Sequence, residues 1–183
     1  MRITIIIPAF NEEEFIGLTL QSLLEQSLQA NEVIVVDDNS TDATAAIVSR
    51  FGESHKNIKL RTKQSSPEHL PGGKVVQAFN YGLQHAQEFD IVCKFDADLI
   101  FPENYLELVA QTFSKNEKTG MAGGFCSIEK DGEWVVENLT NKDHIRGALK
   151  AYRRECFEQI GGLREAMGWD TVDELLAQYH GWE

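Results

Sequence analysis

Residues Asp90 to Pro102 read D-I-V-C-K-F-D-A-D-L-I-F-P, and this segment decides the fold assignment. An apolar, strand-like run ends abruptly in two carboxylates, those of Asp96 and Asp98. In an extended chain, residues two positions apart point to the same side of the backbone, so both carboxylates would face one site. Burying two unpaired carboxylates is costly, and such a pair at the end of a strand therefore implies a divalent cation or solvent.

The end of a strand is where sites form in open α/β sheets, because ligands bind in the crevice outside the carboxyl ends of the strands. Ile91, Val92 and Phe95 would bury the strand, and Asp96 would emerge where it ends. The alternative is a solvated acidic turn before the helix that follows Pro102. This segment alone leaves metal binding and the solvated turn equally open.

The composition excludes several functional classes. Lys and Arg number 17 and Asp and Glu 29, so the net charge is -12 and the surface repels nucleic acid. The three cysteines are widely spaced and form no C-x-x-C pair, which indicates neither a disulfide framework nor a zinc site. Reduced thiols are typical of a cytoplasmic protein. No stretch approaches the length of a membrane span.

Two strand–turn–helix units precede the acidic segment. Residues 2–8 and 32–36 are mostly apolar and β-branched, the pattern of central parallel strands that are buried on both faces. A polar turn and a helical pattern follow each strand, and Glu12 to Glu14 are expected in the first turn of the first helix. Asp37 and Asp38 end the second strand, so we expect them on the same rim of the sheet as Asp96.

The rest of the chain continues the alternation, which predicts a mainly parallel sheet covered by helices. It becomes less regular after Phe125. The expected segments are a strand at 58–62, an irregular segment at 63–73, helices at 74–87 and 103–113, a strand at 120–125, a hairpin around Asp131-Gly132, a basic segment from Lys142 to Arg154, and a last helix from about Gly168 to His180.

Phosphate-binding glycine motifs are missing, since the first turn reads P-A-F-N-E and there is neither G-x-G-x-x-G nor G-x-x-x-x-G-K-[ST]. A phosphate-bearing ligand would therefore be held through a metal on Asp96 and Asp98, aided by Lys74 or Arg146. For Lys74 the alternative is a solvated helix start.

Five segments together resemble the inverting family 2 glycosyltransferases, whose fold is called GT-A. They occur in family order and cover nearly the whole chain. The segments are I-I-I-P-A-F-N-E-E, V-I-V-V-D-D-N-S-T-D-A-T, G-G-K-V-V-Q-A-F-N-Y-G-L, K-F-D-A-D-L-I-F-P and R-R-E-C-F-E-Q-I-G-G-L. The resemblance implies a single GT-A domain over residues 1–183, a Rossmann-like, mainly parallel sheet covered by helices. Residues 1–125 would bind the nucleotide-sugar and residues 126–183 would form the acceptor side.

The resemblance also implies the reaction and its donor site. The donor would be a UDP- or GDP-sugar, and the acceptor a hydroxyl of a glycan, lipid or polysaccharide, as in cell-envelope polysaccharide biosynthesis. Asp96 and Asp98 would be the D-x-D pair that binds Mn²⁺ or Mg²⁺ across the diphosphate, where a cation acts as Lewis acid. The residues expected to bind the nucleotide or donor are Pro8, Ala9, Phe10, Asn11, Glu12, Asp37, Asp38, Lys74, Asp96 and Ala97.

An inverting transfer needs a general base for the acceptor hydroxyl. In the family this is usually the Asp of a Glu-Asp pair, about eleven residues before a glycine and an aromatic residue. Counting back from Gly181-Trp182 gives Asp170, although Trp169 stands where the Glu is expected. Asp173 and Glu174 are the reserve candidates on the same helical face. Acids at this place also complement the helix dipole without any catalytic role.

Parts of the sequence also fit two other functions. The D-A-D-L-I run after an apolar strand also resembles the nucleophile strand of haloacid-dehalogenase-type phosphatases, in which the first Asp forms an aspartyl-phosphate. A catalytically inactive nucleotide-binding domain is the non-enzyme alternative. Family members usually continue beyond this point, so we expect a chain truncated at its C-terminus. We expect a cytoplasmic location, with attachment to the inner face of the membrane left open.

Overall fold

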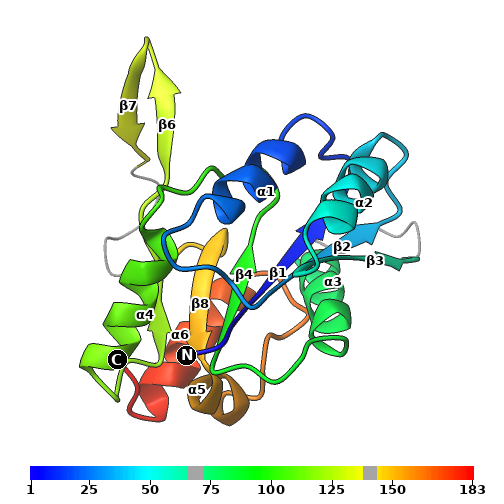
Figure 1. Ribbon diagram of the computed structural model, residues 1–183. Helices are drawn as coiled ribbons and strands as arrows, with labels where there is room; N and C mark the ends of the chain where they lie inside the picture. Colours follow the sequence, from blue (N-terminus) through cyan, green and yellow to red (C-terminus); the bar gives the residue numbers. More distant parts are fainter. Residues whose placement is uncertain (66–71, 138–143) are drawn as a thin grey trace.

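The computed structural model describes residues 1–65, 72–137 and 144–183 (Figure 1). A six-stranded sheet has the order β3-β2-β1-β4-β8-β5, and a separate hairpin pairs β6 with β7. The strands are β1 (Ile3–Ala9), β2 (Glu32–Asp38), β3 (Ile58–Lys63), β4 (Ile91–Phe95), β5 (Met121–Ala122), β6 (Ser127–Lys130), β7 (Glu133–Val136) and β8 (Leu149–Arg153). The helices are α1 (Ile16–Leu24), α2 (Thr44–Ser54), α3 (Gly73–Leu83), α4 (Tyr105–Lys115), α5 (Arg154–Gln159) and α6 (Trp169–Tyr179).

The centre of the sheet is parallel, as predicted. β1 pairs in parallel with β2 and with β4, and β2 pairs in parallel with β3. Every residue of β2 and β4 is buried, and so are all residues of β1 except Pro8, because these strands carry apolar side chains toward both faces. The carboxyl ends of β1, β2 and β4 therefore lie at one rim.

Helices cover both faces of this sheet (Figure 1). On one face, α1, α2 and α4 pack on the odd-numbered residues of β1 and β4, such as Ile5 and Cys93. On the other face, α3, α5 and α6 pack on Ile6, Ile34 and Val92. The alternation of strand side chains thus supplies two separate cores. Within the described ranges, no helix combines the length and the apolar character needed to cross a membrane.

The largest departure from the predictions is β8. The sequence predicts only a basic segment here, from Lys142 to Arg154, of which Lys142 lies outside the described residues. In the structure β8 is inserted between β4 and β5 and runs antiparallel to both. Its Lys150 side chain is 0% exposed. The basic residues of this segment do not look like those of a buried strand. Lys150 can be buried only because Asp173 and Glu174 of α6, which is distant in the sequence, neutralise its charge.

Two boundaries also differ. The strand expected at 120–125 is reduced to β5. Just after it, at Gly123, the chain passes so close to Ile145 that a Cβ atom would overlap its side chain. The first helix begins at Ile16, so Glu12 to Glu14 precede it and its first turn contains no acid.

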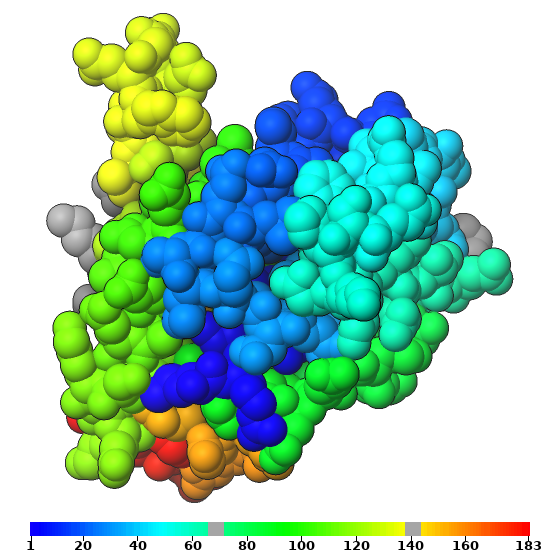
Figure 2. Space-filling model, in the orientation of Figure 1, coloured from blue at the N-terminus to red at the C-terminus, as the bar shows by residue number. Residues whose placement is uncertain are grey.

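The expected hairpin is confirmed as β6–β7, with Asp131 and Gly132 at positive φ in its turn. It stands out from the rest of the surface (Figure 2).

Helix α3 packs closely on the sheet at Gly82, which leaves no room for a side chain. A Cβ atom at Gly82 would lie 2.7 Å from Ile6 Cγ2 and 2.8 Å from Val36 Cγ2, two methyl groups on stiff, buried side chains. We expect Gly82→Ala to lower the free energy of unfolding by about 1–2 kcal/mol, because overpacking outweighs the better helix propensity of alanine. Urea unfolding measures this change. Gly17→Ala is the control, since its Cβ would meet only Ile47 Cγ2 at 3.7 Å and should be neutral or stabilising.

Candidate functional site

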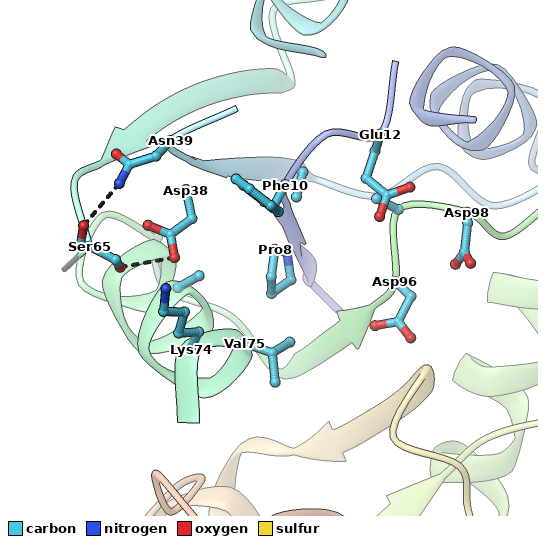
Figure 3. Close-up of a pocket in the computed structure, with 13 residues that line it drawn as sticks. Pro8, Phe10, Glu12, Asp38, Asn39, Ser65, Lys74, Val75, Asp96 and Asp98 are labelled. Atoms are coloured by element: carbon cyan, nitrogen blue, oxygen red, sulfur yellow. Dashed lines mark hydrogen bonds between the residues drawn. The ribbon is translucent and has the colours of Figure 1, made fainter. Parts of the chain in front are cut away.

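A cleft of about 640 Å³ opens at the rim where β1, β2 and β4 end (Figure 3). Its walls come from the turns after these three strands and from the first turns of α3. This is the position expected for a ligand site in an open α/β sheet. The lining residues are Pro8, Ala9, Phe10, Glu12, Asp38, Asn39, Ser65, Lys74, Val75, Ala78, Asp96, Ala97 and Asp98.

One end of the cleft is acidic, because Glu12, Asp96 and Asp98 gather there (Figure 3). Burial raises the pKa of the Glu12 carboxyl, and the negative charges of Asp98, Asp96 and Asp42 raise it further. The two aspartates therefore make the Glu12 carboxyl costlier to ionise, and a cation placed among the three side chains would relieve this repulsion.

The D-x-D turn is held in place by polar side chains of α1 and of the turn that follows it. Thr19 donates a hydrogen bond from its hydroxyl to the Ala97 carbonyl oxygen at 2.6 Å. Ser22 accepts one from the Phe101 backbone N–H at 3.1 Å, and Gln26 binds the chain on both sides of the α4 start. These bonds satisfy buried backbone groups. The two carboxylates are consequently presented by a fixed turn.

The opposite end of the cleft contains Asp38, Ser65, Lys74 and Asn39 (Figure 3). Asp38 Oδ2 accepts a hydrogen bond from the Ser65 hydroxyl at 2.9 Å, and Lys63 Nζ lies 4.0 Å from Asp38 Oδ1. That Oδ1 atom is buried and has no hydrogen-bond partner among the described residues. Because an unsatisfied buried acceptor is costly, a hydrogen bond from a ligand N–H or O–H to this atom would be favourable.

Two asparagines shape the turns that build the cleft. Asn11 and Asn39 adopt φ values of 55° and 66°, a left-handed conformation that asparagine tolerates better than most residues. Asn11 Oδ1 accepts the Thr41 N–H at 2.8 Å, and Asn11 N–H donates to the Ser40 hydroxyl at 2.9 Å. The turns after β1 and β2 therefore brace each other.

The acceptor-side candidates lie on α6, where a buried ammonium organises them. Lys150 Nζ donates to Asp173 Oδ1 at 2.8 Å, to Glu174 Oε1 at 2.9 Å and to the Asp170 carbonyl oxygen. Tyr152 donates its hydroxyl to Asp173 Oδ2 at 2.6 Å. Burial raises the pKa of the Asp173 carboxyl, and Lys150 offsets only part of that rise. Both carboxylate oxygens of Asp173 are thus hydrogen-bonded inside the protein.

Asp170 differs from its two neighbours because its side chain is 32% exposed. Its carboxylate lies 3.8 Å from His144 Nε2 and forms no hydrogen bond within the described part of the chain. Gly147 leaves it space, since a Cβ there would lie 3.2 Å from Asp170 Oδ2. The next residue, Ala148, accepts the Asp96 N–H at 2.8 Å. One dipeptide therefore touches both the acidic end of the cleft and Asp170.

Most donor-site candidates from the sequence line the cleft, but three basic or polar ones do not among the residues described. Asn11 uses its side chain in the turn, and Arg146 pairs with Glu137. Asp37 is buried on the opposite sheet face, the face of Val35, because side chains alternate along β2. Sequence reasoning missed Asn39, Ser65, Val75 and Ala78. Ser65 lies in the irregular segment at 63–73, of which 66–71 are outside the described residues.

The donor set at the acidic end fits a hard divalent cation. Mg²⁺ and similar ions prefer carboxylate oxygens and are often held by one or two of them together with substrate phosphates. No group of three or more His, Cys, Asp or Glu side chains in ranges 1–65, 72–137 and 144–183 is arranged to hold a metal unaided. A site built on Asp96 and Asp98 would need further oxygens from a ligand.

Comparisons with known sequences agree with the resemblance to family 2 glycosyltransferases. The sequence profile described as glycosyl transferase family 2 matches residues 4–164. The chain is 28% identical to a probable glycosyltransferase, YdaM, of Bacillus subtilis, over 97% of this chain and 44% of that protein. It is 35% identical to the beta-monoglucosyldiacylglycerol synthase of Synechocystis, over 100% of this chain and 41% of that protein.

Solved structures show the same fold. The mannosyltransferase PcManGT from Pyrobaculum calidifontis, in complex with GDP-Man and Mn²⁺, superposes with a TM-score of 0.73 at 24% identity over 100% of this chain and 53% of its own. TarS of S. aureus in complex with UDP-GlcNAc gives a TM-score of 0.68 at 20% identity, over 96% and 54%. These likenesses confirm the expected GT-A fold. The chain spans about half, or less, of the length of each protein compared.

Lys150 is the residue on which the α6 contacts depend. We expect Lys150→Met to lower the free energy of unfolding by about 3–5 kcal/mol, because Asp173 and Glu174 would lose the cation that neutralises them inside the protein. Chemical unfolding followed by circular dichroism measures the loss. Arg154→Met removes an exposed cation that pairs with Glu88 and Glu158, and it should change stability far less. Equal effects of the two changes would contradict this account of α6.

Proposed function

Because the chain belongs to glycosyl transferase family 2, we propose that it forms the catalytic domain of an inverting, metal-dependent glycosyltransferase. It would move a sugar from a UDP- or GDP-sugar to a hydroxyl of a carbohydrate or lipid-linked acceptor. The observation that carries this proposal is the cleft of about 640 Å³, in which an end with paired carboxylates and an end with an unsatisfied acceptor share one rim. The activity of a whole protein longer than this chain is part of the proposal.

The nucleotide would occupy the end of the cleft at Asp38. Uracil and guanine both present a ring N–H, and the free Oδ1 atom of Asp38 would accept it. Phe10 lines this cleft with a largely exposed ring, on which a base or ribose would pack. Lys74, at the start of α3, would contribute positive charge toward the phosphates.

The diphosphate would lie between Lys74 and the acidic end, with Mn²⁺ or Mg²⁺ held by Asp96 and Asp98. A divalent cation there supplies positive charge to the leaving nucleoside diphosphate. The GDP-Man and Mn²⁺ bound to PcManGT support such a donor and ion for this chain. The UDP and UDP-GlcNAc bound to TarS support the alternative nucleotide.

Asp170 is our candidate for the general base. The acceptor oxygen would attack the anomeric carbon from the side opposite the diphosphate, the bond to the diphosphate would break, and the hydroxyl proton would pass to Asp170. Partial exposure and a carboxylate without hydrogen bonds in the described chain suit this role. Asp173 and Glu174 are both bound by Lys150, so we assign them to positioning α6.

The two other functions receive less support. In a phosphatase of the haloacid-dehalogenase type, the turns after β1 and β2 would have no role, whereas here they build half of the cleft. An inactive domain would have no reason to keep both carboxylates at a costly acidic end. Residues 1–125 would then bind the donor and residues 126–183 the acceptor. We place the reaction in the cytoplasm, in the synthesis of a cell-envelope glycan or glycolipid.

The donor proposal is tested by calorimetric titration with UDP and with GDP, each with and without Mn²⁺. We expect one nucleotide to bind in a Mn²⁺-dependent manner. Asp98→Asn should weaken that binding by at least about 10- to 100-fold, a loss seen even for residues that only support a metal ligand. Glu14→Gln removes an exposed carboxylate outside the cleft and should bind as the unaltered protein does. Undiminished Mn²⁺-dependent binding in Asp98→Asn would overturn the metal assignment.

The base proposal predicts a separation of binding from turnover. Asp170→Asn should lower the rate of release of the nucleotide from its sugar donor by about 10²- to 10⁴-fold, the usual contribution of a general base. Its affinity for the nucleotide and its melting temperature should stay the same, because the Asp170 side chain lies outside the cleft, forms no hydrogen bond in the described part of the chain and has only a 3.8 Å contact with His144 Nε2. Asp173→Asn should instead lower the melting temperature. Unchanged activity in Asp170→Asn would overturn the base assignment.

A further inference from the structure

Lys94 is a buried cation beside the acidic end of the cleft. It lies on β4, two residues before Asp96, and its side chain is 3% exposed. Its ammonium pairs with Asp96 Oδ1, whereas the Asp96 side chain is 39% exposed toward the cleft. Within the described residues it forms no other hydrogen bond or ion pair. Burying a charge is costly unless it is paired, so the contact with Asp96 is the one that offsets the cost of placing this ammonium in the interior.

A second buried lysine explains why Lys94 depends on Asp96 alone. Lys150 on β8 is the register partner of Lys94 on β4. The Trp169 ring centroid lies 5.5 Å from Lys94 Nζ and 5.9 Å from Lys150 Nζ. Both lysines therefore share the face of one indole. The carboxylates of α6 are already bound to Lys150, which leaves Asp96 as the anion for Lys94.

This arrangement changes what a metal ion would meet at the D-x-D pair. One oxygen of Asp96 is occupied by an ammonium, and that ammonium cannot move away into water because β8 and Trp169 enclose it. A divalent cation arriving alone would compete with Lys94 for Asp96 and would be repelled by its charge. A cation that arrives with a diphosphate brings negative charge that offsets this repulsion.

We propose that Lys94 is a positioning residue of the donor site, which weakens the binding of a divalent cation alone to Asp96 and Asp98 and so makes the cation enter together with the nucleoside diphosphate. The proposal rests on the proposed function, since it takes Asp96 and Asp98 as the metal ligands. It assigns Lys94 no contact with the reacting atoms.

The test compares Mn²⁺ affinities in the absence of any nucleotide, measured from the electron paramagnetic resonance signal of free Mn²⁺. We expect Lys94→Met to bind Mn²⁺ about tenfold or more tightly than the unaltered chain, a coupling of ordinary size for two linked sites. Lys115→Met is the matched control, because it removes the same charge from the last turn of α4, away from the cleft. Its Mn²⁺ affinity should not change.

The same titrations are repeated with saturating UDP and with GDP. In the unaltered chain the nucleotide should increase the affinity for Mn²⁺. In Lys94→Met this increase should be smaller, by the same factor by which the substitution raises the Mn²⁺ affinity in the absence of nucleotide. Lys94→Gln, which keeps a hydrogen-bond donor beside Asp96 but no charge, should behave as Lys94→Met does. It keeps the test available if the methionine variant fails to fold, as judged by thermal melting.

Mn²⁺ affinity in a folded, uncharged variant that is equal to or weaker than that of the unaltered chain would overturn the proposal. The failure of the proposed function would look different. In that case neither UDP nor GDP would bind to the unaltered chain with Mn²⁺ present, whatever the Mn²⁺ titrations without nucleotide show. Each failure is read from its own titration.

Discussion

Three neighbouring parallel strands, β1, β2 and β4, are buried and mostly apolar toward both faces, and this constraint decides where the chain can place most of its polar chemistry. Their side chains can face only the two helical layers, so carboxylates and turn residues are displaced to the strand ends. Because the strands run in the same direction, those ends meet at one rim. The cleft, its acidic end and its Asp38 end all follow from that arrangement.

The features that follow from local patterns were predictable from the sequence. Apolar runs gave β1, β2 and β4, helical periodicity gave most helices, and the i, i+2 spacing of Asp96 and Asp98 placed both at the rim. β8 was not predictable in this way. Its Lys150 looks like a surface residue until α6, far along the chain, supplies Asp173 and Glu174. Ser65 was missed for a similar reason, because only the folded turn after β3 brings it to Asp38.

Buried charges connect the two halves of the candidate site. Asp96 pairs with Lys94, Lys94 and Lys150 flank the Trp169 ring, and Lys150 holds the carboxylates of α6. The Trp169 ring lies within 5.5 Å of one ammonium group and 5.9 Å of the other, and these two groups come from adjacent strands. Both of these lysines are paired with carboxylates: Lys94 with Asp96, and Lys150 with Asp173 and Glu174. Such pairing is the condition for charges to be tolerated inside a protein. The position of α6 is thereby tied to the turn that carries Asp96.

The insertion of β8 between β4 and β5 also has a consequence for the order of folding. β4 ends at Phe95 and β8 begins at Leu149, so their pairing closes a long loop, whereas β1, α1 and β2 are neighbours along the chain. Contacts between distant segments form slowly, because the entropy of loop closure is lost before they are made. Until β8 arrives, β4 remains an edge strand with Lys94 in water, and β5 has no strand to pair with. The pairing of β1 with β4 spans an even longer stretch of chain, so loop closure alone does not favour either half of the sheet, but the charged interior would form only once β4, β8 and α6 have all docked.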